Sequence, residues 1–414
     1  MKKYIGIILL CSLFLCTCKQ NEDAIAVIWT DSIEFIAYSR AFNSAQAKYK
    51  ITVSYKENPA EAIINAAQPP DIVIGPWLKG DAARVKFIKI NSLLSEKHID
   101  PAIFYPSLLE LGNVNGNQYL LPVSFNLPTI IFSNIQKNSI KTNFTISLEE
   151  MRTLAAGYNK KQGGEYSRMG FSPRWDMNFL YATAQGLNAS FEEKNQFFSW
   201  KDQALQDVIT YTRRWSEEIN TSAALEDEFK FKYLYDPPHS LVTSGRCLFW
   251  YLPSNELFSL NHEKLKSLDY RWMSYDGKTP LQDNILYAGI CKKAQNKAAA
   301  KAFLLWFFNA ESQKELLARA QTDNMIAPSF GLAGGFSSLR SVTENIFPVY
   351  YPLLLKHLPQ TEDFSAPYIL PNNWEQLKKE IIFPFLQDQT RTLGPDEKPL
   401  PLSKRISEWH KKNY

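Results

Sequence analysis

The chain has 414 residues, of which 45% are hydrophobic, 14% aromatic and 21% charged, a composition that can bury enough core for two domains. Its net charge of +4 is close to neutral for this length, so the charge balance gives no support for a nucleic-acid partner. The sequence contains no P-loop, HExxH, GxSxG or CxxC motif, so the usual signatures of enzymes are missing as well.

The first segment, MKKYIGIILLCSLFLCTC, has the pattern of an export signal. Two lysines precede an apolar run over residues 4–15, and this run is too short to span a bilayer because a spanning helix needs roughly 20 residues. We therefore predict a signal peptide over residues 1–17, which is removed from the mature protein and takes no part in the fold.

The end of that segment resembles a bacterial lipobox. In Leu15-Cys16-Thr17-Cys18, a large apolar residue and two small residues precede the last cysteine. This pattern predicts that a diacylglyceryl group is attached to Cys18, with Cys16 as the alternative acceptor. An ordinary export signal, in which cysteine serves as a small hydrophobe, is the other interpretation. Because two or more acyl chains anchor a protein stably, a lipidated tether at residues 18–23 would hold the protein on a bacterial membrane outside the cytoplasm.

The segments after the tether alternate between strand and helix patterns. We predict in turn a buried strand, an amphipathic helix, a second strand, a short helix and a third buried strand, at residues 24–30, 33–42, 49–55, 59–67 and 71–74. This alternation predicts an α/β layer with a parallel sheet, in which ligands bind beyond the carboxyl ends of the strands. The two turns at those ends, residues 29–31 and 75–77, each carry a tryptophan.

A series of segments appears in the order typical of one family. The segments are AFNSAQAKYKITV, QPPDIVIGPW, INSLLSEKHID, NGNQYLLPVSFNLPTIIFSN, SLEEMRTLA, TSGRCLFWYLPSN and YAGICKKAQNKAAAKAFLLWFFNAESQKELL. Over nearly the whole mature chain, this series resembles the extracytoplasmic solute-binding proteins of carbohydrate ABC importers, the maltose-binding type. One departure is Leu252-Pro253-Ser254, where many members have Gly-Pro-Trp, so a usual sugar-stacking ring is missing at Ser254.

The resemblance implies an α/β fold of the periplasmic-binding-protein type II. Each of two lobes would be a mainly parallel sheet flanked by helices, with lobe one at 22–122 plus 277–327 and lobe two at 123–276 plus 328–414. A sugar or oligosaccharide would be captured in the cleft between the lobes by hinge closure and delivered to the transmembrane subunits of an ABC permease. The protein would be a monomer and a binding protein, not an enzyme, and it would use no cofactor, metal or nucleic acid.

A sugar-binding site needs flat aromatic rings for the C–H faces and polar side chains for the hydroxyl rim. Aromatic residues at the predicted turns and beside the Leu-Pro-Ser loop, with their polar neighbours, meet this need. The candidate ligand-binding residues are Trp29, Thr30, Asp31, Trp77, Phe125, Asn126, Trp175, Asp176, Trp250, Tyr251 and Asn255. Asp31 has a second interpretation as a helix N-cap. The tryptophans in helical patterns are instead predicted to be core, namely Trp215, Trp306, Trp374 and Trp409.

Three other functions stay open at this point. A glycosidase would need paired acidic residues across a cleft, and Asp31 and Asp176 could face each other, although no sequence feature marks either as catalytic. The same fold could bind a polyamine, a metal, a phosphate or a peptide instead of a sugar. A surface adhesin or structural lipoprotein that has lost transport would fit the missing loop tryptophan.

Two cysteines lie beyond the leader. Cys247 and Cys291 both stand in strand-like apolar runs, RCLFW and AGICK. An export compartment permits a disulfide, but the apolar surroundings favour two buried free thiols over a bridge.

The assignment of the lipid to Cys18 is testable by cell fractionation. We expect Cys18→Ser to move the protein from the membrane fraction to the soluble fraction, because the acceptor thiol is gone. Cys16→Ser is the matched control and should leave the protein in the membrane fraction. A Cys18→Ser protein that stays with the membrane would contradict lipidation at this residue.

Overall fold

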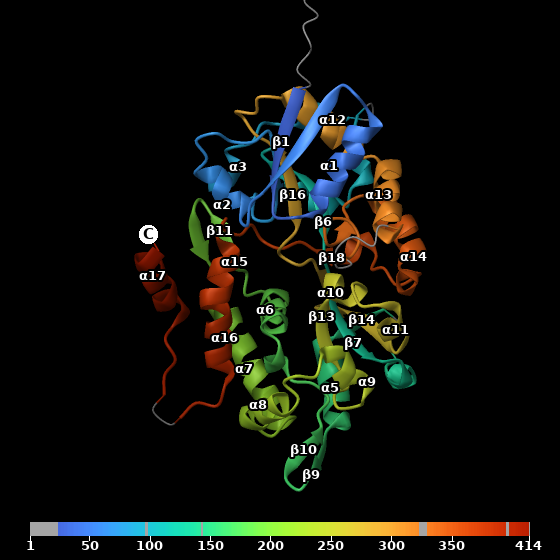
Figure 1. Cartoon of the computed structure of the whole chain (residues 1–414). Coiled ribbons are helices and arrows are strands. Elements are labelled where there is room, and N and C mark those ends of the chain that lie inside the picture. Colours follow the sequence, from blue (N-terminus) through green and yellow to red (C-terminus); the bar gives the residue numbers. More distant parts are fainter. Residues whose placement is uncertain (1–23, 96–97, 142–143, 323–328, 395–396, 414) are drawn as a thin grey trace, which may run out of the picture.

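The computed structural model describes residues 24–95, 98–141, 144–322, 329–394 and 397–413. These residues form two lobes, one above the other in Figure 1, and each lobe is built around its own β-sheet. The predicted α/β fold with two lobes is therefore confirmed. The predicted signal peptide, the tether and Cys18 lie outside the described residues.

The upper lobe contains a six-stranded sheet in the order β17-β6-β16-β3-β1-β2. The strands are β1 (Ala24–Thr30), β2 (Tyr49–Tyr55), β3 (Ile72–Gly75), β6 (Leu121–Phe125), β16 (Leu286–Ile290) and β17 (Phe336–Ser337). β1 pairs in parallel with β2 and β3, so the three predicted strands and their parallel pairing are confirmed. β16 runs antiparallel to both β3 and β6.

Helices cover this sheet, and two short strands form a separate hairpin. They are α1 (Glu34–Ala45), α2 (Pro59–Ile64), α3 (Asp81–Arg84), α4 (Pro106–Glu110), α12 (Lys297–Phe307), α13 (Ala310–Thr322), β4 (Asn113–Val114) and β5 (Asn117–Gln118). The helical spacing of Phe35, Tyr38 and Phe42 places their rings on one buried face of α1. This face packs against Phe303 and Phe307 of α12, with ring centroids 5.5 Å apart for Phe42–Phe303 and 5.6 Å for Phe35–Phe307.

The lower lobe contains a four-stranded sheet in the order β13-β7-β14-β8. Its strands are β7 (Pro128–Ser133), β8 (Thr145–Ser147), β13 (Trp250–Pro253) and β14 (Leu268–Ser274). β7 is antiparallel to β13 and β14, whereas β8 is parallel to β14. The resemblance implied mainly parallel sheets, but both sheets are mixed, because strands that enter or leave the other lobe run against their neighbours.

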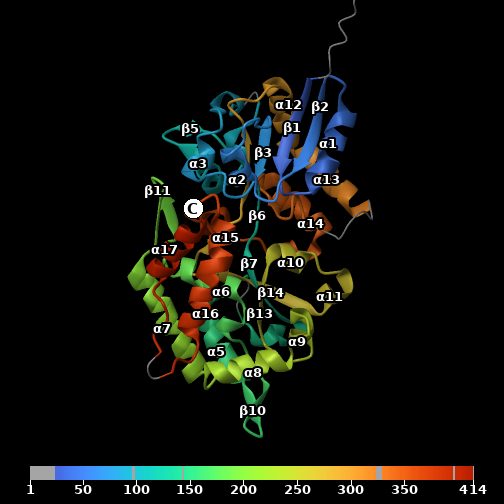
Figure 2. The same cartoon turned by 60° about the vertical axis from the view of Figure 1, so that its left-hand side comes forward.

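The lower lobe has helices on both sides of its sheet and two projecting hairpins (Figures 1 and 2). They are α5 (Leu148–Tyr158), α6 (Met177–Gly186), α7 (Asp202–Glu218), α8 (Ala223–Lys232), α9 (Pro238–Thr243), α10 (Ser254–Phe258), α11 (His262–Lys266), β9 (Lys160–Gln162), β10 (Glu165–Arg168), β11 (Glu192–Lys194) and β12 (Phe197–Ser199). The C-terminal region adds α14 (Phe347–Tyr350), α15 (Trp374–Leu377), α16 (Phe383–Thr390) and α17 (Leu402–Asn413). None of the helices in the described ranges is long and apolar enough to cross a membrane.

The chain passes between the lobes more than once. Only Asn126 and Leu127 separate β6 in the upper sheet from β7 in the lower one. The chain returns from β14 to β16 through β15 (Thr279–Pro280), which pairs with β18 (Phe364–Ser365) from the C-terminal region. β17 joins the upper sheet beside β6, although the predicted boundary assigned residues 328–414 to the lower lobe. The other predicted lobe boundaries stay predictions.

The tryptophans predicted to be core are nearly all inside the protein. Trp215 and Trp374 are fully buried and Trp409 is 5% exposed, as predicted. Trp306 is only partly buried, but its ring packs on Phe42 with centroids 5.5 Å apart. The helical patterns around these residues therefore predicted their environment.

The two cysteines beyond the leader are buried and unpaired, and they belong to different lobes. The backbone of Cys247 forms an isolated β-bridge with Met169 in the lower lobe. The backbone of Cys291 forms one with Phe87 in the upper lobe. Burial raises the pKa of the Cys291 thiol to about 12 and that of the Cys247 thiol further still, so both remain protonated and unreactive at neutral pH.

Candidate functional site

The predicted site residues fall into three groups. The first group follows the upper-lobe strands and contains Trp29, Thr30, Asp31 and Trp77. The second lies at the crossover between the sheets and contains Phe125 and Asn126. The third belongs to the lower lobe and contains Trp175, Asp176, Trp250, Tyr251 and Asn255. Nothing in the sequence separates these residues as candidates, but their surroundings in the structure differ.

Asp31 stands at the carboxyl end of β1 with an unused oxygen. α1 begins at Glu34 and its N-cap residue Ile33 makes no side-chain cap, so Asp31 is not the cap of this helix. Within the described residues, the buried Oδ1 atom of Asp31 has no hydrogen-bond donor. Burial raises the pKa of the Asp31 carboxyl to about 6, and the nearby Glu34 adds to the shift. A buried acceptor without a donor is costly, so Asp31 is suited to a ligand that donates hydrogen bonds.

Two neighbours of Asp31 have structural partners. Thr30 is buried, and its Oγ1 accepts a hydrogen bond of 3.0 Å from the backbone N–H of Ser32. Trp29 is partly exposed, and the Nζ atom of Lys56 lies 4.6 Å from its ring centroid. A cation at this distance is attracted to the face of the ring, so Lys56 covers one face of Trp29.

Trp77 is buried in the turn after β3. Its side chain is only 4% exposed, and its φ of 61° places the backbone in the left-handed region that favours glycine. The Nζ atom of Lys378, from the C-terminal region, lies 5.5 Å from the Trp77 ring centroid. In this conformation Trp77 therefore offers no open ring face to a solute.

Lys79, in the same turn, is a further candidate that the sequence patterns do not single out. Its side chain is buried, and within the described residues Nζ has no hydrogen-bond acceptor. Nζ lies 5.0 Å from the Tyr287 ring centroid, and burial lowers the pKa of Lys79 to about 8 despite the opposing charge of Asp283. The one signal in the sequence was its position two residues after Trp77, in a turn already identified as a possible ligand loop.

The crossover residues are fully engaged by the protein. Phe125 is buried and packs its ring on Tyr105 and Phe336. Asn126 donates from Nδ2 to the carbonyl of Gly334 at 2.9 Å, and its Oδ1 accepts from Ser254 Oγ at 2.7 Å. These two residues therefore fix how the chain leaves the upper sheet.

Trp175 is the middle ring of a stack in the lower lobe. It belongs to η4 (Pro173–Trp175) and lies between Phe229 and Trp250, with ring centroids 5.5 and 5.3 Å away and interplanar angles of 15° and 18°. Both faces of Trp175 are therefore covered by other rings. Trp250 ends the stack and is partly exposed, so it is the ring of the three that best suits contact with a solute.

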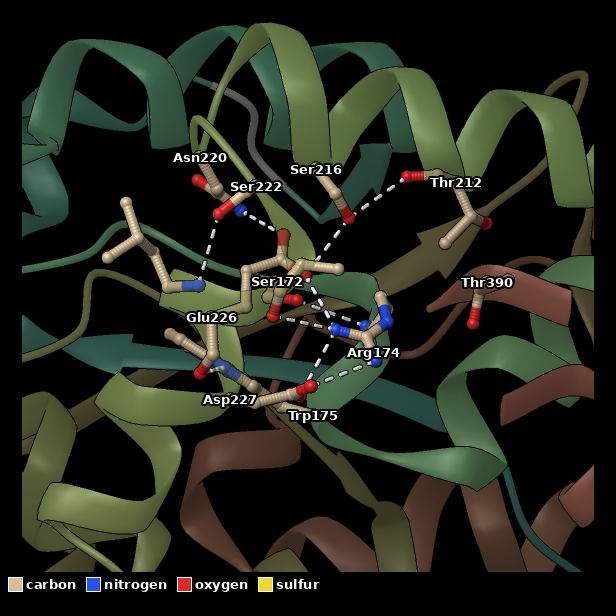
Figure 3. Close-up of polar contacts among 12 residues, drawn as sticks. Ser172, Arg174, Trp175, Thr212, Ser216, Asn220, Ser222, Glu226, Asp227 and Thr390 are labelled. Carbon is tan, nitrogen blue, oxygen red and sulfur yellow. Dashed lines mark hydrogen bonds and ion pairs between the residues drawn. The ribbon is translucent and has the colours of Figure 1, made fainter. Parts of the chain in front are cut away.

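A polar network with the buried Glu226 at its centre holds Trp175 in place (Figure 3). Its indole Nε1 donates to the carbonyl of Glu226 at 3.2 Å. The Glu226 carboxylate accepts from Asn220 Nδ2 at 2.7 Å and from Ser216 Oγ at 2.9 Å, and burial raises its pKa. Arg174 donates two hydrogen bonds, of 3.1 and 3.2 Å, to the carboxylate of Asp227. The network thus ties η4 to α7 and α8 and makes the stack a rigid part of the lower lobe.

Asp176 directly follows Trp175, and Asn255 lies in α10, the helix that follows β13. Asp176 caps α6, because its Oδ1 accepts from the backbone N–H groups of Asn178 and Phe179 at 2.7 and 3.2 Å, and burial raises its pKa. Asn255, in α10, has a buried Oδ1 atom without a donor among the described residues. Asn255 therefore shares with Asp31 an acceptor that the protein leaves free.

Tyr251 has a partner at the crossover. Its ring is buried, and its hydroxyl accepts a hydrogen bond of 3.2 Å from Gln282 Nε2. Gln282 also donates its backbone N–H to the carbonyl of Asn126 at 2.9 Å. Tyr251 therefore supports the crossover, and Trp250 is the more accessible of the two neighbours.

Comparison with known proteins identifies the class. A family model of bacterial extracellular solute-binding proteins matches residues 37–329, which is well over half of the chain, so the protein belongs to this family. The fold, two lobes joined by several crossovers, is the fold of solved binding proteins of the maltose-binding type. A search of curated protein sequences gave no match.

Solved structures of binding proteins align over most of the chain. CpMnBP1 with mannotriose bound is 14% identical, with a TM-score of 0.58, and the alignment covers 93% of this chain and 99% of that one. The substrate-binding protein Lmo0181 from Listeria monocytogenes, in complex with cycloalternan, is 12% identical, with a TM-score of 0.61 and coverage of 94% and 97%. The maltose-binding protein MalE from the same organism, in complex with maltose, is also 12% identical, with a TM-score of 0.61 and coverage of 94% and 98%.

The raised pKa of Asp31 makes stability depend on pH. Because the folded-state pKa is about 6 against an ordinary 3.8, the folded chain holds the proton more strongly, and stability falls as pH rises between these values. Asp31→Asn should therefore be more stable than the wild type by about 1–3 kcal/mol above pH 7, and this advantage should disappear below about pH 4. Unfolding measured from pH 4 to 8 tests this, with the exposed Glu57→Gln as control. Parallel profiles for Asp31→Asn and the wild type would show that Asp31 is not the buried titrating group.

The burial of Trp77 predicts a structural role that can be separated from ligand contact. Trp77→Ala should lower the free energy of unfolding by about 3–5 kcal/mol, as for other buried aromatic rings. Denaturant unfolding without ligand measures this loss, and Trp306→Ala, at a partly buried site, should lose less. A Trp77→Ala protein with wild-type stability would overturn the structural role and leave Trp77 as a ligand-stacking residue.

Proposed function

We propose that the protein is a lipid-anchored, extracytoplasmic binding protein that captures a sugar or oligosaccharide between its lobes and delivers it to an ABC permease. The partly exposed ring of Trp250, at the end of the rigid three-ring stack, carries this proposal. A fixed aromatic ring is the group on which the C–H face of a sugar packs, and fixing it in advance lowers the entropy cost of binding.

The free acceptors support the same proposal. Asp31 Oδ1 and Asn255 Oδ1 are buried and without donors among the described residues. Sugar hydroxyls are hydrogen-bond donors and would satisfy both atoms. With Asp31 on the upper lobe and Asn255 on the lower, one ligand that reached both would hold the lobes together.

The proteins with this fold supply the third support. Three of the solved structures similar to this chain contain mannotriose, cycloalternan or maltose, and we transfer the class of ligand, not a particular sugar. The extracellular family fits the predicted leader, and a lipid on Cys18 would keep the protein at the membrane in which a permease lies.

One observation favours a second candidate, a solute that is not a sugar. Ser254 stands where many members of this class carry a stacking tryptophan, and here it is fully buried. Its hydroxyl donates to Asn126 Oδ1 and accepts from the Leu127 N–H at 3.1 Å. The hydrogen bonds of Ser254 therefore hold this loop against the crossover. In β13, only the ring of Trp250 is then left to stack on a sugar.

A thermal-shift screen separates the two candidates. Mannotriose, maltose and a wider sugar panel are compared with polyamines and short peptides, since a ligand at 100 times its dissociation constant adds about 2.7 kcal/mol to stability. We expect a sugar to raise the melting temperature. A rise with a polyamine or a peptide, and with no sugar, would replace the sugar in the proposal by that solute.

Trp250→Ala then tests the stacking role with the sugar found in that screen. We expect the affinity to fall by roughly 10- to 100-fold, which corresponds to about 1.4–2.8 kcal/mol. Titration calorimetry measures the affinity, and Trp306→Ala, whose ring packs on Phe42 of α1, is the control that should bind normally. Unchanged affinity for Trp250→Ala would assign the stacking contact to another ring, with Trp29 as the remaining partly exposed candidate.

A further inference from the structure

The two lobes touch along one side of the molecule, away from the crossovers. The hairpin of β11 and β12 rises from the lower lobe to the level of α2 and α3 in both views (Figures 1 and 2). Glu193 Oε2, in β11, accepts a hydrogen bond of 3.2 Å from the backbone N–H of Asp81, the first residue of α3. Asn58, which caps α2, donates from Nδ2 to the carbonyl of Asn372 at 3.3 Å. We call these four residues, with Gly80, the seam.

Gly80 shows how closely the lobes approach at the seam. A Cβ atom on Gly80 would lie 3.0 Å from Glu193 Oε2, 3.2 Å from the carbonyl oxygen of Leu370 and 3.4 Å from the backbone nitrogen of Asn372. All three atoms belong to segments of the lower lobe or the C-terminal region. The φ of −54° and ψ of 146° at Gly80 suit any residue, so it is the neighbours, not the backbone conformation, that make this position tight: an added Cβ would require them to move apart.

The lower-lobe side of the seam is rigid. The backbone N–H of Glu193 donates to the carbonyl of Ile369 at 2.7 Å, which joins the hairpin to the C-terminal segment. Behind the hairpin, Phe191 and Phe198 pack on the buried Trp374, with ring centroids 5.9 and 5.5 Å away. The hairpin and the segment that carries Asn372 therefore move as one body.

A buried ion pair continues the contact toward the crossovers. Lys378 Nζ lies 3.3 Å from Asp283 Oδ1, and Asp283 Oδ2 accepts a hydrogen bond of 2.7 Å from Trp374 Nε1. Both charged side chains are 8% exposed. Lys378 also lies over the ring of Trp77 in the upper lobe. The C-terminal region thus reaches the upper lobe at Trp77 as well as at the seam.

We propose that the seam is a latch that holds the two lobes together in the ligand-free protein. Hinge opening on this side must separate Glu193 from Asp81 and Asn58 from Asn372, and must lift Lys378 from Trp77. A solute can enter the space between the lobes only while the latch is open, so the latch lowers the rate of solute entry by the fraction of molecules in which it is closed. The latch goes beyond the proposed sugar binding and does not depend on it.

Two substitutions open the latch by different means. Gly80→Ala inserts a methyl group between the lobes, and Glu193→Ala removes the acceptor for the Asp81 N–H. The matched controls are Gly157→Ala, where an added Cβ meets no atom within 4 Å, and Glu192→Ala, the neighbouring carboxylate of the same hairpin. Spin labels on Glu57→Cys and Asp207→Cys, both exposed, report the separation of the lobes on this side, since the native Cys247 and Cys291 are buried.

The distances are measured on the full mature protein without any ligand. We expect one short distance for the wild type and both controls, and a distribution lengthened by more than ~2 Å for Gly80→Ala and Glu193→Ala, with melting temperatures close to that of the wild type. A wild type that already samples long distances, or latch variants with the wild-type distribution, would overturn the latch. Because no sugar is present, this result is independent of the sugar screen.

Discussion

The link of two residues between β6 and β7 is the constraint on which the rest of this structure depends. With only Asn126 and Leu127 between them, the Cα atoms at the end of β6 and the start of β7 can lie no more than about 11 Å apart. Hydrogen bonds from Ser254 and Gln282 to Asn126, and from Asn126 to Gly334, bind the other passages of the chain to this link. The lobes are therefore fixed at the crossovers and can separate only on the side that faces away from them.

The two lobes contribute different kinds of side chain to the candidate site. The lower lobe contributes rings that its own interior holds still, because the Trp175 indole is hydrogen-bonded to Glu226 and stacked on both faces. The upper lobe contributes polar groups that its interior does not satisfy, the Asp31 carboxylate and the Lys79 ammonium. Burying such groups lowers the stability of the fold, and buried polar groups without partners occur mainly at functional sites.

The strands and the class of fold could be predicted from the sequence, because they depend on local patterns. The runs at 24–30 and 49–55 coincide with β1 and β2, and the turns after β1 and β3 do carry polar groups with perturbed pKa values. The environment of each ring could not be predicted in the same way. Trp175 and Trp250 stand in similar short segments, but Phe229, 54 residues after Trp175, covers one of them and not the other. Contacts of this range leave no trace in local periodicity.

The environment of a polar side chain is equally hard to predict from local sequence, as Asp31 shows. Its position before a helix fits an N-cap, and only the helix start at Glu34 separates the two interpretations. A cap would have had its oxygen satisfied by amides of α1, as Asp176 is satisfied by α6. The contrast between these two aspartates is informative. Each follows a tryptophan closely in the sequence and is largely buried, but Asp176 is committed to its own helix, whereas Asp31 keeps an oxygen for a partner that the described chain does not provide.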